Sequence, residues 1–284
     1  MAEYFDALET RDPEERERAL MSALAAQVAH AKADTAYYAK LFAEIDPETV
    51  RSRQALAQLP LTRKSDLIAL QAADPPFGGL AALPASGLKR LFVSPGPIYD
   101  PEGDAPDYFR FARALFACGI RRGMIVHNTF AYHFTPAGFM FDAAARALGC
   151  PVIPAGPGNT ELQARAIAHY RPAAYVGTPD FLRTILEKAE ELGLDASSIR
   201  YGHVTAGPFL PALRAWYAER GLTVLQSYGT ADLGLVAYET QAREGLDPRR
   251  ARHRRDRPPR HRRTRSRRRG RRGRGDACSP RPIR

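Results

Sequence analysis

The chain has 284 residues, of which 44% are hydrophobic, enough for one large domain or two small ones. Its net charge of +11 is unevenly spread: residues 249–284 hold 18 arginines and two acids, and the other 24 basic and 29 acidic residues leave the body at −5. The acidic start and the lack of a long apolar run exclude a signal peptide and a membrane-spanning helix. Three widely spaced cysteines (Cys118, Cys150, Cys278) argue against disulfides and zinc, and indicate a reducing cytoplasm.

The sequence predicts a helical N-terminal region over residues 1–87, because alanine, glutamate, arginine and leucine dominate this stretch. Asp12 followed by Pro13 predicts a helix start, with the aspartate as the N-cap. Thr62 predicts the cap of a further short helix. The turn-rich residues 73–84 end the region.

Residues 88–246 predict an α/β domain, in which apolar strands alternate with helical patterns. Such alternation is typical of a mostly parallel sheet with helices on both faces. The predicted strands are residues 90–93, 124–130, 151–154, 173–177, 202–205 and 223–227. The predicted helices are residues 107–118, 137–148, 161–169, 180–192 and 211–220, several of them ended by a glycine: Gly119, Gly149, Gly193 and Gly221.

The stretch 223–240, TVLQSYGTADLGLVAYET, carries the chemistry expected of a nucleotide site. An apolar strand leads into a turn with an aromatic ring (Tyr228), a hydroxyl (Thr230) and a carboxylate (Asp232). In open α/β folds ligands bind at the carboxyl edge of the sheet, where such a turn lies. A ring can stack, a hydroxyl can contact phosphate and a carboxylate can hold a hard metal ion. A buried strand followed by an ordinary turn fits the stretch equally well.

The loop after the first predicted strand is SPGPIYDPEG, residues 94–103. Phosphate-binding loops need small residues, free backbone N–H groups and usually a lysine. Ser94 and Gly96 suit such a loop, but three prolines remove donors and no lysine is present. We therefore favour a rigid turn here.

An aromatic loop, residues 128–138, follows the second predicted strand. Its three aromatic side chains beside a Pro-Ala-Gly helix start could line an apolar pocket. His133 could act as a base, although a single histidine in an aromatic loop is more often structural. We favour a pocket-lining role. In the turn after the fifth predicted strand, Gly207 would let a planar ring approach the backbone.

Eight short pieces occur in one collinear order between residues 37 and 239: YYAKLF, LPLTRKSDL, PFGGLAA, HNTFAYHFTPAG, GNTELQ, YVGTPDFL, TAGPFLPALR and QSYGTADLG. In this order the chain resembles the phenylacetate-CoA ligase branch of the adenylate-forming (AMP-binding) enzymes. The resemblance implies that ATP and Mg²⁺ convert a carboxylic acid to an acyl-adenylate, and that coenzyme A then takes the acyl group as a thioester. No membrane partner is implied, and a homodimer is one possible assembly.

The resemblance also implies roles for individual residues. Tyr228 would stack on adenine, Gly229 would permit that contact, Thr230 would contact the α-phosphate and Asp232 would hold Mg²⁺; the last two would be catalytic. The remaining implied positions are Gly207 and Pro208 at the adenine, Ser94 and Gly96 at the nucleotide phosphates, and Tyr132, His133, Phe134, Thr135 and Gly138 at the acyl pocket.

Three departures from the family pattern stand out. The phosphate loop lacks its lysine, Asp232 replaces a glutamate, and the resemblance stops before the family's ribose-binding aspartate and mobile C-terminal domain. Residues 247–284 instead form an arginine-rich tail. It could be a nucleic-acid-binding arm, a disordered linker or a translated frameshift.

We favour the frameshift, because the tail contains no lysine and plausible codons read one base later give alternating strand-like sequences. The expected protein is then a truncated ligase, impaired in turnover, that binds nucleic acid only non-specifically through the tail. The alternatives are a nucleic-acid-binding or scaffold protein acting through that tail and a degenerate pseudoenzyme.

Overall fold

The computed structural model describes residues 4–242 and 246–247, and every structural statement below concerns this part of the chain. The arginine-rich tail predicted from the sequence, apart from Asp247, lies outside the described residues. Within the described ranges, no helix combines the length and the apolar character needed to cross a membrane.

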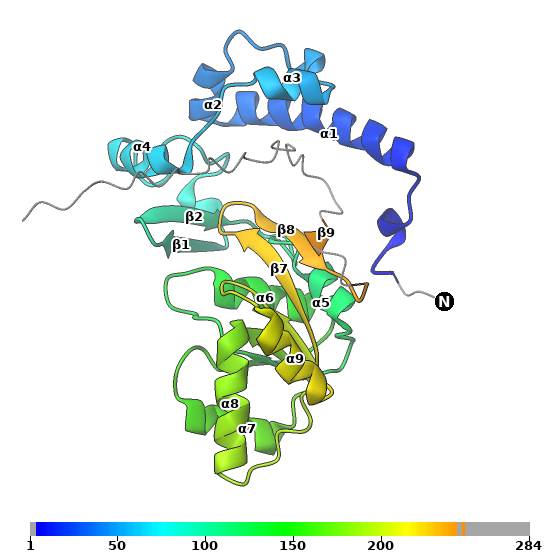
Figure 1. The fold of residues 1–284 in the computed structure, drawn as a ribbon. Coiled ribbons are helices and arrows are strands. Elements are labelled where there is room, and N and C mark those ends of the chain that lie inside the picture. The colour runs from blue at the N-terminus through cyan, green and yellow to red at the C-terminus, as the bar shows by residue number, and fades with distance from the viewer. Residues whose placement is uncertain (1–3, 243–245, 248–284) are drawn as a thin grey trace, which may run out of the picture. The chain divides into compact units, whose positions relative to one another are not determined.

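The N-terminal region is helical, as predicted (Figure 1). Its elements are the 3₁₀ helix η1 (Ala7–Glu9), α1 (Pro13–Asp34), α2 (Ala36–Leu41), η2 (Pro47–Thr49), α3 (Arg53–Gln58), η3 (Lys64–Asp66), α4 (Leu67–Ala73) and η4 (Ala85–Gly87). The Asp12 carboxylate caps α1 by accepting hydrogen bonds from the Glu14 and Glu15 backbone N–H groups at 2.9 and 3.0 Å. The cap predicted at Thr62 is wrong, because the N-cap position of η3 is Arg63 and the Thr62 hydroxyl instead donates to the Tyr38 phenol at 3.2 Å.

The first predicted parallel strand is part of a separate two-stranded ribbon. β1 (Arg90–Ser94) pairs antiparallel with β2 (Ile98–Glu102), so that Ser94 lies opposite Ile98. A parallel pair needs a crossover of a dozen or more residues, whereas these strands are joined by a tight turn. A turn is found at residues 95–97, within the stretch 94–103 where a turn is predicted, but residues 98–102 form β2. The parallel pairing expected for residues 90–93 is wrong.

The other predicted parallel strands form one sheet, whose order in the described chain is β4-β3-β5-β6-β7-β8-β9. The strands are β3 (Val126–Asn128), β4 (Val152–Pro154), β5 (Ala174–Gly177), β6 (Tyr201–Val204), β7 (Thr223–Thr230), β8 (Gly234–Glu239) and β9 (Leu246–Asp247). All pairings from β4 to β7 are parallel, and β8 and β9 continue the sheet antiparallel. The predicted fold class is confirmed.

Helices cover both faces of this sheet. Side chains along a strand alternate between the two faces, so one strand contributes to two cores. Ala174 and Val176 of β5 pack into the core formed with α5 and α6, whereas Tyr175 packs into the core formed with α7, α8 and α9. These helices are α5 (Ala112–Cys118), α6 (Ala137–Ala147), α7 (Thr160–Tyr170), α8 (Pro179–Glu191) and α9 (Pro211–Glu219). The glycines predicted to end four of them all have left-handed φ angles: Gly119, Gly149, Gly193 and Gly221.

Helix α5 begins five residues later than predicted. The preceding segment bends at Arg110, which has a φ of 63°, and the Asp107 carboxylate reaches forward to accept a hydrogen bond from the Ala112 N–H at 3.0 Å. The helix predicted from residue 107 is therefore wrong in its first turn, where the chain forms a loop that caps α5.

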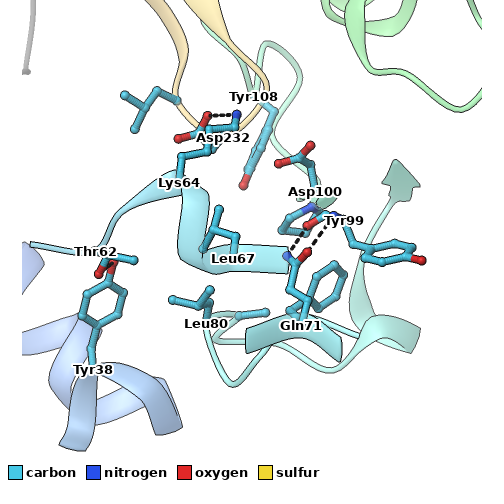
Figure 2. Close-up of a pocket in the computed structure, with 14 residues that line it drawn as sticks. Tyr38, Thr62, Lys64, Leu67, Gln71, Leu80, Tyr99, Asp100, Tyr108 and Asp232 are labelled. Carbon is cyan, nitrogen blue, oxygen red and sulfur yellow. Dashed lines mark hydrogen bonds and ion pairs between the residues drawn. The ribbon is translucent and has the colours of Figure 1, made fainter. Parts of the chain in front are cut away.

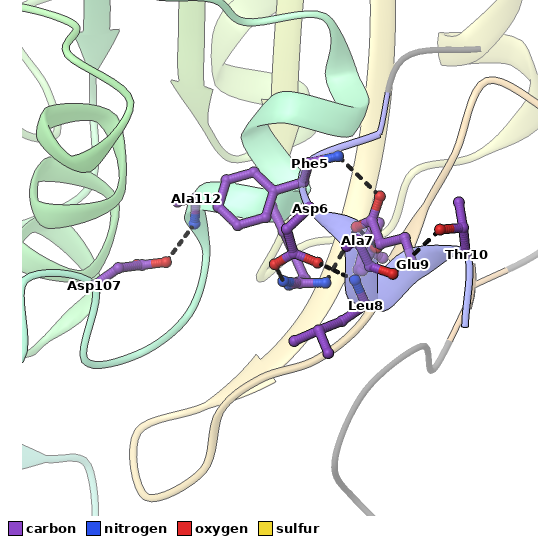
Figure 3. A network of polar contacts seen from close by, with 10 residues as sticks. Phe5, Asp6, Ala7, Leu8, Glu9, Thr10, Asp107 and Ala112 are labelled. Atoms are coloured by element: carbon purple, nitrogen blue, oxygen red, sulfur yellow. Dashed lines mark hydrogen bonds and ion pairs between the residues drawn. The ribbon is translucent and has the colours of Figure 1, made fainter. Parts of the chain in front are cut away.

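A polar cluster joins the N-terminal segment to the α/β core (Figure 3). The buried Arg113 guanidinium of α5 donates to Asp6 and Glu9, each at 3.1 Å, and the Tyr238 hydroxyl of β8 donates to Glu9 at 3.1 Å. Buried charges are tolerated when they are paired and hydrogen-bonded in this way. The start of the chain is thereby held against its central sheet.

Candidate functional site

The predicted nucleotide-binding stretch forms a hairpin and not a strand that ends at Ser227. β7 continues to Thr230 and pairs antiparallel with β8, so the turn is at residues 231–233. The register shifts between Tyr228 and Gly229. A Cβ at Gly229 would lie 2.7 Å from the Phe111 ring, so glycine is required where the bulged strand passes that ring. The apolar run from Leu233 to Tyr238 is the sequence signal of this second strand.

Tyr228 offers a free ring face at the end of the parallel part of the sheet. Its side chain is exposed, with a relative accessibility of 54%, although its backbone pairs with Ala237 of β8. The Thr205 hydroxyl donates to the Ser227 carbonyl at 2.8 Å, which brings the turn containing Gly207 and Pro208 to the end of β7. The predicted adenine-binding residues therefore share one sheet edge.

Thr230 and Asp232 frame the turn that follows. The Thr230 hydroxyl accepts a hydrogen bond from the Leu233 N–H at 3.1 Å, which orders the turn. The Lys64 ammonium lies 3.2 Å from the Asp232 Oδ1. Burial alone would raise the pKa of the Asp232 carboxyl, but hydrogen bonds from Thr230, its own backbone N–H and Lys64 outweigh burial and lower the pKa. Asp232 is thus kept ionised.

Ser94 and Gly96 lie in the tight turn between β1 and β2. The Ser94 hydroxyl donates to the buried Asp100 carboxylate across the ribbon, and a Cβ at Gly96 would lie 2.9 Å from Ile98. Burial raises the pKa of Asp100, and the nearby Asp232 charge raises it further, against the opposing effects of Ser94 and Lys64. The turn is therefore flanked by the Asp100 carboxylate, which is unfavourable to a phosphate.

The predicted acyl-pocket residues share one loop, whose side chains point in different directions. Tyr132 points inward: its hydroxyl accepts a hydrogen bond from the Asn128 amide at 2.8 Å, and burial raises the pKa of this phenol. His133 and Phe134 are exposed, the latter at 78%, and Thr135 is half-buried. Gly138 is enclosed, since a Cβ there would lie 2.5 Å from the Ala131 carbonyl oxygen. The structure thus places Tyr132 and Gly138 inside the fold and His133 and Phe134 at its surface.

A cavity of about 500 Å³ lies between the N-terminal helices, the β1–β2 ribbon and the 231–233 turn (Figure 2). Its lining residues are Tyr38, Thr62, Lys64, Leu67, Gln71, Phe77, Leu80, Ala81, Tyr99, Asp100, Pro101, Tyr108, Asp232 and Leu233. Of the predicted site residues, Asp232 lines this cavity. Gln71 holds its far wall together by donating to the Tyr99 carbonyl at 2.8 Å and accepting from the Tyr99 N–H at 2.9 Å.

The residues present fit a magnesium ion brought in by a nucleotide. In the described chain no cluster of three or more His, Cys, Asp or Glu could hold a metal without help. Mg²⁺ in nucleotide sites is commonly held by one or two carboxylates together with substrate phosphates and water. Asp232, ionised and already paired with a cation, supplies one such carboxylate.

Sequence reasoning missed Lys64, Asp100, Gln71 and Tyr108, all of which line the cavity. Lys64 falls within LPLTRKSDL, but nothing in the sequence connects it to an aspartate 168 positions away. Asp100 falls within residues 94–103, where no local pattern marks this carboxylate as part of a site. Both become visible once the ribbon and the N-terminal helices meet around Asp232.

Comparison with known proteins gives consistent relatives, although no family model matches the chain. A phenylacetate-coenzyme A ligase of Thermus thermophilus is 31% identical over 244 residues, which is 81% of this chain and 53% of that protein. Enzymes of the same name from Aromatoleum evansii and Escherichia coli are 30% and 29% identical over 72% and 80% of this chain. The chain spans about half the length of these relatives.

The fold is also that of a solved enzyme. A 2-hydroxyisobutyryl-CoA ligase, in an open conformation with 2-HIB-AMP and CoA, superimposes with a TM-score of 0.76 at 23% identity. The match covers 82% of this chain and 54% of the other. Two independent comparisons, of sequence and of structure, therefore agree.

Proposed function

This chain belongs to the phenylacetate-coenzyme A ligase-like, adenylate-forming proteins, and from that premise we propose that it activates a carboxylic acid with ATP and passes the acyl group to coenzyme A. The observation that carries the proposal is the β7–β8 hairpin, which places a free aromatic ring, a hydroxyl and an ionised carboxylate in sequence at the carboxyl edge of the parallel sheet. The relatives are longer than this chain. The proposal therefore concerns the ligase reaction to which this part of the fold contributes.

In this mechanism the protein acts mainly by positioning. Tyr228 stacks on the adenine, in the space bordered by Gly207 and Pro208. The Thr230 hydroxyl binds an oxygen of the α-phosphate. A carboxylate oxygen of the substrate attacks the α-phosphorus to form the acyl-adenylate, the bond between that phosphorus and the α–β bridging oxygen breaks, and pyrophosphate leaves. When bound, magnesium neutralises charge on the phosphates. Asp232 is the residue that would hold it.

The acid substrate is proposed to be an aryl or other apolar carboxylate bound beside the aromatic loop of Tyr132, His133, Phe134, Thr135 and Gly138. Phe134 offers exposed aromatic surface there, and Tyr132 supports the loop from within. We place the protein in the cytoplasm, because the thiols of Cys118 and Cys150 are free and buried.

The decisive experiment is acid-dependent exchange of labelled pyrophosphate into ATP by the purified chain, with a series of aryl and alkyl acids. Exchange that needs both Mg²⁺ and an apolar acid, and that falls at least about tenfold in Thr230→Ala and Asp232→Asn, is the expected result. Exchange that proceeds equally well in both variants would remove these residues from the mechanism. ATP that neither exchanges nor binds would overturn the proposal itself.

A further inference from the structure

Lys64 lines the cavity, beside the carboxylate that would hold magnesium (Figure 2). It is the basic residue among the described cavity-lining side chains, and it comes from the N-terminal helical region. Both side chains of the Lys64–Asp232 pair are about half exposed. Ion pairs this exposed contribute little to the free energy of unfolding. Stability therefore does not explain why a lysine is placed here.

The β1–β2 turn leaves a requirement for positive charge unmet. Pro95 and Pro97 have no backbone N–H to donate, and the Ser94 hydroxyl is bonded to Asp100. Asp100 adds a carboxylate to the same cavity wall. The cation of the ribbon, Arg90, is paired with Glu102. A nucleotide that brings several negative charges to Asp232 thus meets a β1–β2 turn with no cation, and its phosphates need a counter-charge from another element.

We propose that Lys64 binds the phosphate groups of the nucleotide, in place of a lysine in the turn between β1 and β2. The inference rests on the proposed function, because it takes ATP as the ligand. Asp232 would hold the nucleotide's metal ion in place of the Lys64 ammonium, which would then be free to turn to the phosphate oxygens. An ammonium on a flexible stem suits a phosphate as a point charge, without the fixed geometry that a guanidinium demands.

Contacts of the N-terminal region fix the position of Lys64 relative to the β1–β2 ribbon. Gln71, on α4 just after the Lys64-bearing η3, is buried and makes two backbone hydrogen bonds to Tyr99 of β2. Tyr99 directly precedes Asp100 in the chain. The lysine and the ribbon that lacks one are therefore fixed to each other by a buried side chain, as a shared phosphate site requires.

The test compares affinities for ATP with Mg²⁺, for AMP and for adenosine, measured by direct titration on the full chain. The variants are Lys64→Met, Lys64→Arg and, as a control, Lys188→Met, which removes another partly exposed lysine that is paired with Glu191 on α8. Lys64→Met is expected to weaken ATP binding at least about tenfold, the loss typical of a hydrogen bond to a charged group. Its adenosine affinity should be unchanged, and Lys64→Arg should retain most of the ATP affinity.

The outcomes separate the two proposals. If the wild-type chain binds ATP and Lys64→Met binds it equally well, Lys64 has no phosphate role and the function stands. If Lys64→Met loses ATP, AMP and adenosine alike and melts earlier, the ion pair is structural and the inference is overturned. If the wild-type chain binds neither ATP nor adenosine, the proposed function fails, and this inference with it.

Discussion

Tyr228 illustrates how one residue can be predicted from sequence while its setting cannot. The motif SYGTAD predicts an aromatic ring next to a glycine for stacking on a base, and Tyr228 is exposed in the structure. Tyr228 lies in an antiparallel strand whose register shifts at the next residue. In this strand pair Gly229 passes close to the Phe111 ring, and Gly234 passes close to the Phe109 backbone. Those two contacts come from a segment more than a hundred residues earlier, which local patterns do not reveal.

Replacing Tyr228 by alanine should weaken ATP binding about tenfold or more, since stacking of a base on an aromatic side chain is worth about 1–3 kcal/mol. Phenylalanine should preserve the affinity, because the ring and not the hydroxyl makes the contact. Titration with ATP measures both. Tyr170→Ala, which removes a similarly exposed tyrosine from α7, is the control. Equal affinities in Tyr228→Ala and the control would exclude stacking at this position.

At the scale of single elements, periodicity predicted the helices and parallel strands well. Alternation between strand and helix requires only local pattern, and four of the helices in the α/β core are followed by a glycine. The failures are the ribbon, the β7–β8 hairpin and the start of α5. In each of these, a turn or a capping side chain decides the structure, so hydrophobic pattern alone assigned the wrong partner or the wrong first residue.

Gly138 at the start of α6 should not tolerate a side chain. An alanine Cβ would lie 2.5 Å from the Ala131 carbonyl oxygen, so the aromatic loop would have to move. We expect Gly138→Ala to lower the free energy of unfolding by about 1–3 kcal/mol, measured by urea denaturation. Gly87→Ala is the control, because its added Cβ would meet nothing nearer than 3.9 Å. Equal stability of both variants would contradict the close packing.

The cap of α5 should make stability depend on pH. Burial raises the pKa of Asp107 from 3.8 to about 6, against the lowering effect of hydrogen bonds from the Ala112 and Phe111 N–H groups. Because the folded-state pKa lies above the unfolded value, the contribution of Asp107 to stability is complete below about pH 4 and is lost as pH rises through 6.

Asp107→Asn keeps an oxygen acceptor for the helix but cannot ionise. Its free energy of unfolding should therefore decline less than that of the wild-type chain between about pH 4 and pH 6. Denaturant titrations at several pH values measure the difference. Parallel pH profiles in the two proteins would mean that Asp107 does not titrate in this window.

At the scale of the whole molecule, the candidate site depends on contacts between the N-terminal helices and the α/β core. The two Gln71 hydrogen bonds to Tyr99 and the Lys64–Asp232 pair connect residues 28 and 168 positions apart. A sequence predicts each helix and strand on its own, but it does not specify which faces meet. The cavity and its lysine could therefore be found only in the assembled structure.

Gln71→Ala should loosen this junction without unfolding the core. Losing two hydrogen bonds, each worth about 1 kcal/mol net, should speed amide exchange in α4 and β2 by about tenfold or more. Amides of β5, in the centre of the sheet, should be unaffected. Hydrogen exchange read by mass spectrometry resolves these segments, with the exposed Gln54→Ala as control. Faster exchange everywhere would mean that the region and the core unfold as one unit.

The polar cluster around Arg113 imposes an order on folding during synthesis, because its members are made at different times. Glu9 leaves the ribosome early, yet one of its partners, Tyr238, is made 229 residues later. At about 5–20 residues per second, the first segment waits on the order of ten seconds or more for the strand that completes its contacts. Nascent chains halted before β8 should have a protease-sensitive start, and longer ones should lose that sensitivity. Asp6 and Glu9 are thus made long before the contacts that hold them are complete.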